Sequence, residues 1–156
     1  MKRLHVLLSI ALVALGSTVA YAQQREVPYW ASIRFEEMYM RVGPSEQYKI
    51  DWVYHRQGLP VKVVRVVEGW RLIRDQDGTE GWVSQSQLDP DPTAVVIGEG
   101  LAAMRDAPAS NAGLKWNAEP GVIGALGDCT AGWCELDVEG REGWVDAERL
   151  WGDGAP

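Results

Sequence analysis

Gly78-Thr79-Glu80-Gly81-Trp82-Val83 is the segment that decides the fold of this chain. It returns as Gly140-Arg141-Glu142-Gly143-Trp144-Val145, and the preceding Gly69-Trp70 returns as Gly132-Trp133. The same order continues upstream in three matched pairs: Met40-Arg41 with Met104-Arg105, Trp52 with Trp116, and Pro60-Val61 with Pro120-Gly121-Val122. A copied unit of roughly 60 residues with glycine-tryptophan corners is typical of a small β-rich binding module.

The residues inside each unit favour strands over helices. Residues 60–67 are rich in β-branched valine, and residues 134–138 alternate apolar and polar side chains. Asp77-Gly78 is a strong signal for a two-residue hairpin turn, and the second unit turns at Glu139-Gly140. We therefore expect an all-β protein with two tandem small barrels, each of five antiparallel strands.

The proline-rich stretch Asp89-Pro90-Asp91-Pro92 separates the two units, because prolines cannot join a hydrogen-bond ladder in the middle of a sheet. We expect the first domain at residues 29–89, a linker at 90–93 and the second domain at 94–152. A unit of this size buries only about 60% of its unfolded surface. We therefore expect buried tryptophans to supply much of each core, and the two domains to dock on one another.

Residues 1–22 have the features of a cleaved signal peptide. Lys2 and Arg3 precede a short apolar core, and Ala20-Tyr21-Ala22 is a typical cleavage site. The apolar stretch is shorter than the roughly 20 residues that a membrane span needs. We expect cleavage after about Ala22, a mature form without a membrane span, and a periplasmic or secreted location.

Cys129 and Cys134 are the only cysteines and flank a four-residue turn. In an oxidising compartment this spacing favours a disulfide across a hairpin. Opposed residues of antiparallel strands place their Cα atoms about 5.5 Å apart, which suits a disulfide. A zinc site would need more ligands, and beyond residue 22 the chain has one histidine, His55. We expect a Cys129–Cys134 disulfide, no metal and no cofactor.

Charge is unevenly distributed along the chain. Residues 23–90 carry a formal net charge of −1 and residues 91–156 carry −8. Phosphate binding needs a basic surface, so we expect neither nucleic acid nor an anionic membrane as a partner. The acidic second half serves solubility or attracts a cationic partner.

Several motifs in this order resemble the bacterial SH3-like domain, and in particular the tandem exported SH3-like proteins of alphaproteobacteria. They are Arg41-Val42-Gly43-Pro44-Ser45, Gly58-Leu59-Pro60-Val61-Lys62-Val63, Trp70-Arg71-Leu72-Ile73-Arg74-Asp75 and Gly78-Thr79-Glu80-Gly81-Trp82-Val83, with Cys129, Trp133-Cys134 and Leu150-Trp151-Gly152 in the second unit. The resemblance covers residues 29–152. It implies a five-stranded SH3-like barrel in each half, used for binding and not for catalysis. Related modules are often linked to cell-wall peptides or glycans.

The tryptophans divide into two groups by their neighbours. Trp82 and Trp144 lie between glycine and valine on a returning strand, and we expect them in the core. Trp70 and Trp133 follow a turn glycine at the start of a strand. For this second pair, a structural role and a binding role both remain open.

Residues 52–56 form the most suggestive aromatic segment. As a strand they would place Trp52, Tyr54 and Arg56 on one face, an arrangement suited to stacking on a sugar or a peptide. The alternative, which we favour for Trp52, is that this residue and its repeat Trp116 belong to the core. The candidate ligand-binding residues are Tyr39, Trp52, Tyr54, Arg56, Trp70 and Trp133.

The sequence offers little for catalysis. A nucleophile needs a base within hydrogen-bond reach, and His55 has no serine or cysteine nearby in the sequence. Residues 75–80 superficially resemble a calcium loop but lack its length and its flanking helices. We expect a non-enzymatic binding module for a cell-wall fragment or a periplasmic protein. The alternative is a structural or assembly protein of the envelope.

Overall fold

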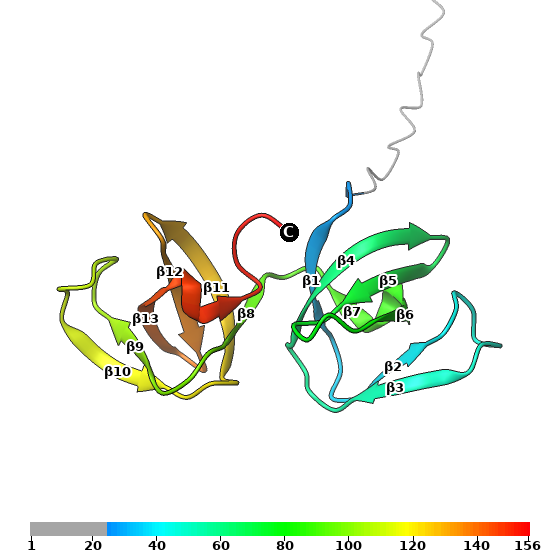
Figure 1. Cartoon of the computed structure of the whole chain (residues 1–156), viewed down its shortest axis with the longest axis horizontal. Helices are drawn as coiled ribbons and strands as arrows, with labels where there is room; N and C mark the ends of the chain where they lie inside the picture. Colours follow the sequence, from blue (N-terminus) through cyan, green and yellow to red (C-terminus); the bar gives the residue numbers. More distant parts are fainter. Residues whose placement is uncertain (1–24) are drawn as a thin grey trace, which may run out of the picture.

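The computed structural model describes residues 25–156, so the expected signal peptide at residues 1–22 lies outside the described residues. The described chain forms two seven-stranded antiparallel sheets, each rolled into a compact domain, and the two lie side by side (Figure 1). The expected all-β fold with two tandem domains is therefore confirmed. No helix in the described part is long and apolar enough to cross a membrane.

The first domain follows the strand order β3-β2-β6-β5-β4-β1-β7. A short 3-10 turn, η1 (Gln85–Gln87), precedes the last strand and brings it back to β1. This short strand is one reason why each sheet has more strands than the five expected. The strands are β1 (Tyr29–Ile33), β2 (Met38–Arg41), β3 (Ile50–Tyr54), β4 (Pro60–Val67), β5 (Trp70–Arg74), β6 (Glu80–Ser84) and β7 (Leu88–Asp89).

The second domain repeats this topology in the order β10-β9-β13-β12-β11-β8-β14. It begins with β8 at Thr93, the last residue of the expected linker, and its 3-10 turn is η2 (Ala147–Arg149). Its strands are β8 (Thr93–Val96), β9 (Ala102–Arg105), β10 (Leu114–Ala118), β11 (Ile123–Thr130), β12 (Trp133–Val138), β13 (Arg141–Asp146) and β14 (Leu150–Trp151).

Where each sheet closes, a glycine of one strand lies beside the buried methionine side chain of the neighbouring strand. A Cβ atom on Gly81 of β6 would lie 2.5 Å from Met40 Sδ of β2, and a Cβ on Gly143 of β13 would lie 2.9 Å from Met104 Cβ of β9. Both methionines are fully buried. Any side chain in place of the glycine would occupy the methionine's space, so the glycine of each Gly-Trp-Val segment leaves room for the buried methionine side chain.

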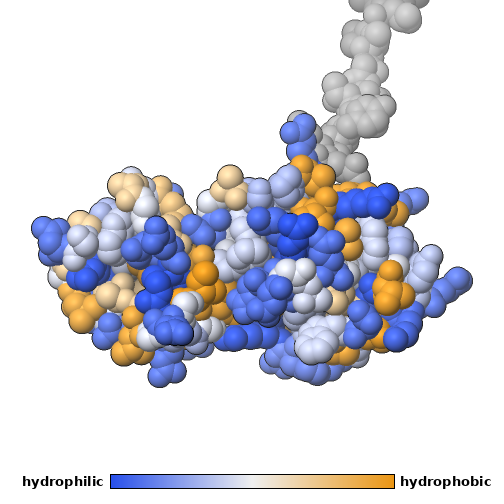
Figure 2. Space-filling view, viewed as in Figure 1, coloured by the Kyte–Doolittle hydropathy of each residue, from blue (hydrophilic) through white to orange (hydrophobic). Residues whose placement is uncertain are grey.

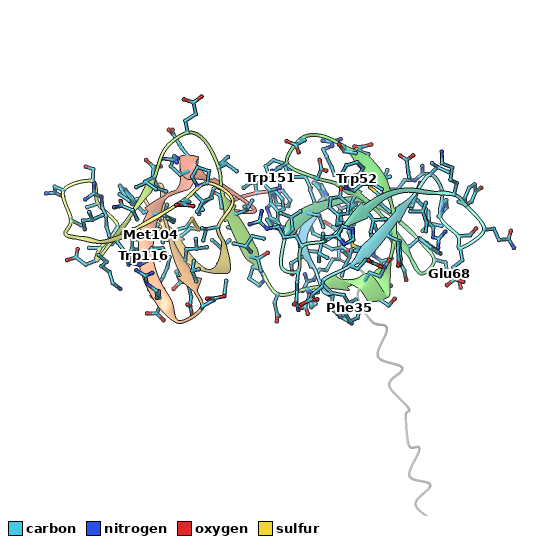
Figure 3. The ribbon with its side chains drawn as sticks, turned by 90° about the horizontal axis from the view of Figure 1, so that it is seen from below. Phe35, Trp52, Glu68, Met104, Trp116 and Trp151 are labelled. Atoms are coloured by element: carbon cyan, nitrogen blue, oxygen red, sulfur yellow. A yellow bond between two sulfur atoms is a disulfide. The ribbon has the colours of Figure 1, made fainter. Side chains whose placement is uncertain are left out.

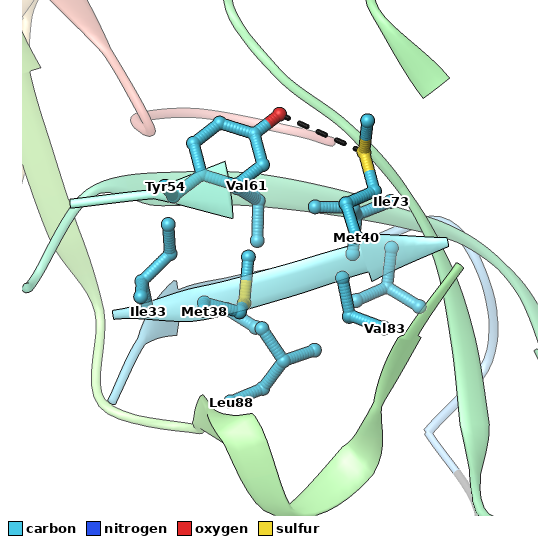
Figure 4. Close-up of a cluster of buried hydrophobic side chains, with 10 residues drawn as sticks. Ile33, Met38, Met40, Tyr54, Val61, Ile73, Val83 and Leu88 are labelled. Atoms are coloured by element: carbon cyan, nitrogen blue, oxygen red, sulfur yellow. Dashed lines mark hydrogen bonds between the residues drawn. The ribbon is translucent and has the colours of Figure 1, made fainter. Parts of the chain in front are cut away.

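The core is aliphatic, and the expected core position of the tryptophans is wrong. All eight tryptophans lie in the described part of the chain, and none of them is buried. Side chains alternate along a strand, so Gly81 and Val83 point inward and Trp82 points outward. Trp144 is placed in the same way. The buried cluster of the first domain contains Ile33, Met38, Met40, Tyr54, Val61, Ile73, Val83 and Leu88 (Figure 4).

The two cores are filled differently at one cross-strand pair. Met38 faces Tyr54 across β2 and β3, whereas Ala102 faces Ala118 at the matching position of β9 and β10. All four side chains are buried. The two alanines fill less volume than the methionine–tyrosine pair. In the second domain the Trp116 side chain packs against the buried core residues and occupies part of this volume.

The hairpin turns also differ between the domains. Glu139 and Gly140, with φ of 54° and 85°, form a two-residue turn between β12 and β13. The expected two-residue turn at Asp77-Gly78 is wrong, because β5 ends at Arg74 and β6 begins at Glu80. The buried carboxylate of Asp75 organises this longer loop, since its Oδ1 accepts hydrogen bonds from the backbone N–H groups of Asp77 (3.1 Å) and Thr79 (2.8 Å).

The expected disulfide between Cys129 and Cys134 is confirmed. The two residues oppose each other on β11 and β12, directly beside the turn at Ala131-Gly132. A loop this short is stabilised by about 2 kcal/mol on the chain-entropy estimate. Cys134 is buried in the second core, so the disulfide joins the tip of this hairpin to the centre of the domain.

The two domains are in contact through aromatic and backbone groups. The Trp30 and Trp151 rings meet edge to face with centroids 5.1 Å apart, and the Lys62 ammonium lies 4.9 Å from the first centroid and 5.4 Å from the second. The C-terminal segment returns to the first domain (Figure 1), where Trp30 Nε1 donates a hydrogen bond to the Gly154 carbonyl. Trp151 lies near the boundary between the domains (Figure 3).

Replacing Gly81 with alanine tests the closure of the first domain. The added methyl group overlaps the Met40 side chain, so we expect Gly81→Ala to lower the free energy of unfolding by about 1–3 kcal/mol. Urea unfolding followed by circular dichroism measures this change. In a Met40→Ala background the same substitution should cost less, because the overlapping atoms are gone. Strictly additive effects of the two substitutions would contradict this packing.

Replacing Trp151 with alanine tests the contact between the domains. The variant loses the edge-to-face contact with Trp30 and the cation–π contact with Lys62. We expect a larger radius of gyration in small-angle X-ray scattering. Arg141→Ala is the matched control, because it removes a cation–π contact within the second domain only. The interface is refuted if both variants scatter like the unchanged protein.

Candidate functional site

The β2–β3 hairpin of the first domain exposes a group of apolar and aromatic side chains. Trp52 is 58% exposed and is the most exposed of the tryptophans. The exposed members of this group, named here the hairpin surface, are Tyr39, Val42, Tyr48, Ile50 and Trp52. In the matching hairpin of the second domain, Leu114 is the exposed large hydrophobic residue.

Local contacts hold this hairpin in shape. Arg41 donates hydrogen bonds from Nη1 to the carbonyl oxygens of Glu46 (3.1 Å) and Tyr48 (2.7 Å) across the turn. The Tyr48 ring covers Gly43, where a Cβ atom would lie 2.7 Å from the ring carbons. The Tyr39 hydroxyl donates to the Glu37 carboxylate, and this bond raises the pKa of the Tyr39 hydroxyl. The hairpin surface is therefore carried on a braced turn.

Trp52 and its repeat Trp116 have different surroundings, and the expected core position of Trp52 is wrong. In the second domain, the Arg141 guanidinium lies 4.5 Å from the Trp116 ring centroid, and Trp116 Nε1 donates to the Glu142 carbonyl. Thr79 and Glu80 stand at the positions of Arg141 and Glu142 in the first domain. Threonine cannot make a cation–π contact, and the larger Met38–Tyr54 pair fills the first core, so Trp52 stays exposed. Figure 3 labels both tryptophans.

Tyr54 does not share an exposed face with Trp52 and Arg56. Its ring is in the core, 7% exposed, and its hydroxyl donates to Asp75 Oδ2 at 2.8 Å. Burial and the Asp75 carboxylate raise the pKa of Tyr54 well above its ordinary range. Arg56 lies beyond the end of β3 and donates a hydrogen bond to the Gly121 carbonyl of the second domain. Both side chains are therefore engaged in holding the structure together.

Trp70 and Trp133 occupy matching positions at the starts of β5 and β12, and both are half-buried. Trp70 lies opposite Ser84, and Trp133 lies opposite Thr130 and Asp146. These strands are separate from the β2–β3 hairpin, which carries Tyr39 and Trp52 of the six candidates. Trp52 lies opposite the buried Met40 and Tyr39 lies opposite Val53, so the two exposed side chains are on opposite faces of this hairpin.

Val42, Tyr48 and Ile50 are the residues that sequence reasoning missed on the hairpin surface. A signal for them exists, since they flank the turn at Gly43-Pro44 and the matching second-domain residues are mostly polar or small. On the face shown in Figure 2, hydrophobic residues form small patches separated by hydrophilic ones. The hairpin surface is distinguished by its exposed aromatic side chains, Tyr39, Tyr48 and Trp52.

His55 lies beside a shallow hollow formed with Glu36, Glu37, Arg56 and Gln57. Its Nδ1 is 3.6 Å from Glu37 Oε2, and both side chains are well exposed. No serine, threonine or cysteine lines this hollow. Across residues 25–156, no three His, Cys, Asp or Glu side chains gather closely enough to hold a metal ion.

Comparison with known proteins gives a family match and several distant structural matches. A family model described as the bacterial SH3 domain matches residues 35–90 and again residues 98–152. No curated protein matches the chain. The solved structure of NlpC2 from Trichomonas vaginalis shares 10% identity over 83% of this chain and 50% of its own, with a TM-score of 0.37.

The structure of NlpC1 from Trichomonas vaginalis shares 12% identity over 91% of this chain and 54% of its own, with a TM-score of 0.35. The chain therefore spans about half the length of these two proteins. At this level of likeness, neither structure bears on the activity of the chain.

Replacing Tyr54 with phenylalanine tests the structural role of its hydroxyl group. The variant removes the hydrogen bond to the buried Asp75 carboxylate, so we expect a loss of about 1–3 kcal/mol in the free energy of unfolding. Because the pKa of Tyr54 is raised in the folded state, the unfolded chain ionises first and stability should fall as pH rises above about 10. That fall should be smaller in Tyr54→Phe. Equal pH profiles would contradict the assignment.

Proposed function

The chain belongs to the bacterial SH3 domain family, and on that premise we propose that it is a non-enzymatic binding module of the cell envelope. Its ligand is a cell-wall peptide or glycan, or a periplasmic protein. The first domain binds through the hairpin surface, and the second domain fixes the position of the first. The observation that carries this proposal is the exposure of Trp52 on a braced hairpin.

The duplication makes this exposure informative. Trp116 occupies the same position on the same fold, with its ring under Arg141 and its indole N–H bonded to Glu142. The fold can therefore accommodate a covered tryptophan at this position. In the first domain Trp52 is 58% exposed, on a hairpin that carries further exposed aromatic and apolar side chains. An exposed indole of this kind has a use where a partner covers it.

The chemistry of this surface suits a sugar ring or an extended peptide. Indole and phenol rings offer large rigid contact faces, and they are enriched at interaction hot spots. On the other face of the hairpin, the Tyr39 hydroxyl donates a hydrogen bond to the Glu37 carboxylate.

Two features support action outside the cytoplasm. Residues 1–22 have the pattern of a signal peptide. The Cys129–Cys134 disulfide is of a kind that persists in oxidising compartments and is rare in the cytosol. The location that we propose is the periplasm or the exterior of the cell.

The non-enzymatic assignment rests on the surroundings of the candidate base. His55 is paired with Glu37 in a shallow hollow without a nucleophile. General base catalysis would need the histidine within hydrogen-bond reach of the group it activates. The residues that line the hollow beside His55 include no serine, threonine or cysteine nucleophile, and this favours binding over nucleophilic catalysis.

Cosedimentation with purified peptidoglycan tests the proposal. We expect the unchanged protein to bind and Trp52→Ala to lose about 2 kcal/mol of binding free energy, or roughly thirtyfold in affinity, as at a central hot spot. Trp116→Ala is the matched control at the repeated position and should keep its affinity, because that ring is already covered. Circular dichroism should show that both variants are folded.

Absence of binding by the unchanged protein would exclude a peptidoglycan ligand. Equal losses in the two variants would exclude the hairpin surface as the binding site. Reproducible crosslinking of a single protein through position 52 in cells would instead support the structural or assembly role.

A further inference from the structure

A second concave site lies on the first domain, away from the hairpin surface. It is a pocket of about 370 Å³ between β1, β5 and the segment around η1 and β7. No residue of β2 or β3 lines it. Its polar lining consists of Arg25, Tyr29, Arg34, Arg71, Gln85 and Asp89. Ligand sites commonly have volumes of about 300–1,000 Å³, so this pocket is large enough for a small molecule or a chain end.

Arg71 is the unusual residue of this pocket. Its side chain is only 7% exposed, yet no Asp or Glu oxygen in the described chain lies within 4.0 Å of its guanidinium. Its contacts are neutral: Nε donates to the Tyr29 hydroxyl (2.9 Å), Nη1 to the Trp70 carbonyl (2.9 Å) and Nη2 to Gln85 Oε1 (2.7 Å). Buried charges are normally paired, so this one lacks its counter-ion.

The hydrogen-bond inventory of Arg71 leaves room for a ligand. A guanidinium has five N–H donors, and the three contacts above use one on each nitrogen. One N–H on each terminal nitrogen is therefore unassigned. A carboxylate accepts two such bonds at once, and this bidentate arrangement is the strong form of the interaction.

The rest of the pocket strengthens the positive potential. Arg25 lies over the Tyr29 ring, 5.8 Å from its centroid, and Arg34 approaches Asp89 at 3.7 Å. Asp89 is the only carboxylate in the lining, against three arginines. The pocket is thus cationic on a protein whose residues 23–156 are strongly acidic.

The second domain shows that the fold does not require this pocket. Cys134 occupies the position of Arg71, because Cys134 pairs with Val145 as Arg71 pairs with the equivalent Val83. On the neighbouring strand, Cys129 pairs with Cys134 as Val66 pairs with Arg71, so Cys129 occupies the position of Val66. Ala147 occupies the position of Gln85, because each backbone N–H donates to the carbonyl of the preceding turn glycine, Gly132 or Gly69. Ile97 occupies the position of Arg34, because each backbone N–H donates to the last residue of the 3-10 turn. The disulfide stands where the first domain keeps a buried arginine, so the arginine has no general structural role in this fold.

We propose that the Arg71 pocket binds the carboxylate of a small organic anion or a peptide end. Arg71 supplies the two terminal N–H donors, and Arg34 and Arg25 at the rim add charge. The apolar part of the lining, which includes Ala31, Val66 and Leu88, receives an aliphatic body next to the carboxylate. Inorganic phosphate has no aliphatic group and would make no contact with these apolar side chains.

Titration of the ¹⁵N-labelled protein tests this site. The probes are N-acetyl-alanyl-alanine, its C-terminal amide and inorganic phosphate, at matched ionic strength. We expect the free acid to shift the amides of Tyr29, Arg71 and Gln85, and the neutral amide to leave them in place. Phosphate should bind at least about tenfold more weakly than the free acid.

Variants at the pocket identify the groups that bind. Arg71→Gln should weaken binding of the acid by at least about tenfold, the effect of losing charge-assisted hydrogen bonds. Because Arg71 is buried, Arg34→Gln at the exposed rim provides a second variant that keeps the fold, and we expect about a threefold loss there. Arg65→Gln, an exposed arginine of the same domain outside the pocket, is the control.

Three results would overturn the proposal. They are equal shifts with the acid and the amide, equal affinities of Arg34→Gln and Arg65→Gln, and tighter binding of phosphate than of the acid. Failure here would leave the Trp52 proposal standing, because the two tests use different residues and different probes.

Discussion

The contact between Gly81 and Met40, repeated as Gly143 and Met104, is the constraint on which each domain depends. The glycine leaves room for the buried methionine side chain, and its inward position fixes which way the rest of the returning strand faces. With glycine turned inward, the following tryptophan must turn outward and the next valine inward. The inward glycine thus explains why Trp82 and Trp144 face outward and why the valine after each of them is buried.

The two copies keep this frame and differ in how they fill it. The first core uses the large Met38–Tyr54 pair and fixes Tyr54 to the buried Asp75 loop. The second uses two alanines, packs Trp116 against the core and adds a disulfide. The second domain has therefore replaced polar and exposed groups of the first with covalent and apolar ones. This division agrees with a binding role for the first domain and a supporting role for the second.

Much of the fold follows from local patterns. The repeat, the valine-rich strand at residues 60–67 and the spacing of Cys129 and Cys134 predicted the two β-domains and the disulfide. The position of Trp82 was wrong because Gly-Trp-Val does not reveal which of two alternating faces is inward. The exposure of Trp52 depends on the volume of Met38 and Tyr54 across the strand pair, and the Arg71 pocket unites β1, β5 and η1. Such long-range pairings have no signature in one local segment.

The incomplete burial of all eight indoles also determines what spectroscopy of this protein reports. Indole emission responds to the polarity around the ring, and Trp52 is more than half exposed whereas the other seven rings are partly buried. The Trp52 ring is therefore open to an added quencher in the folded protein, and a partner that covers it would protect it. Unfolding would expose the other seven rings and change their emission as well. The exposed indole of Trp52 therefore makes binding at this surface measurable by fluorescence.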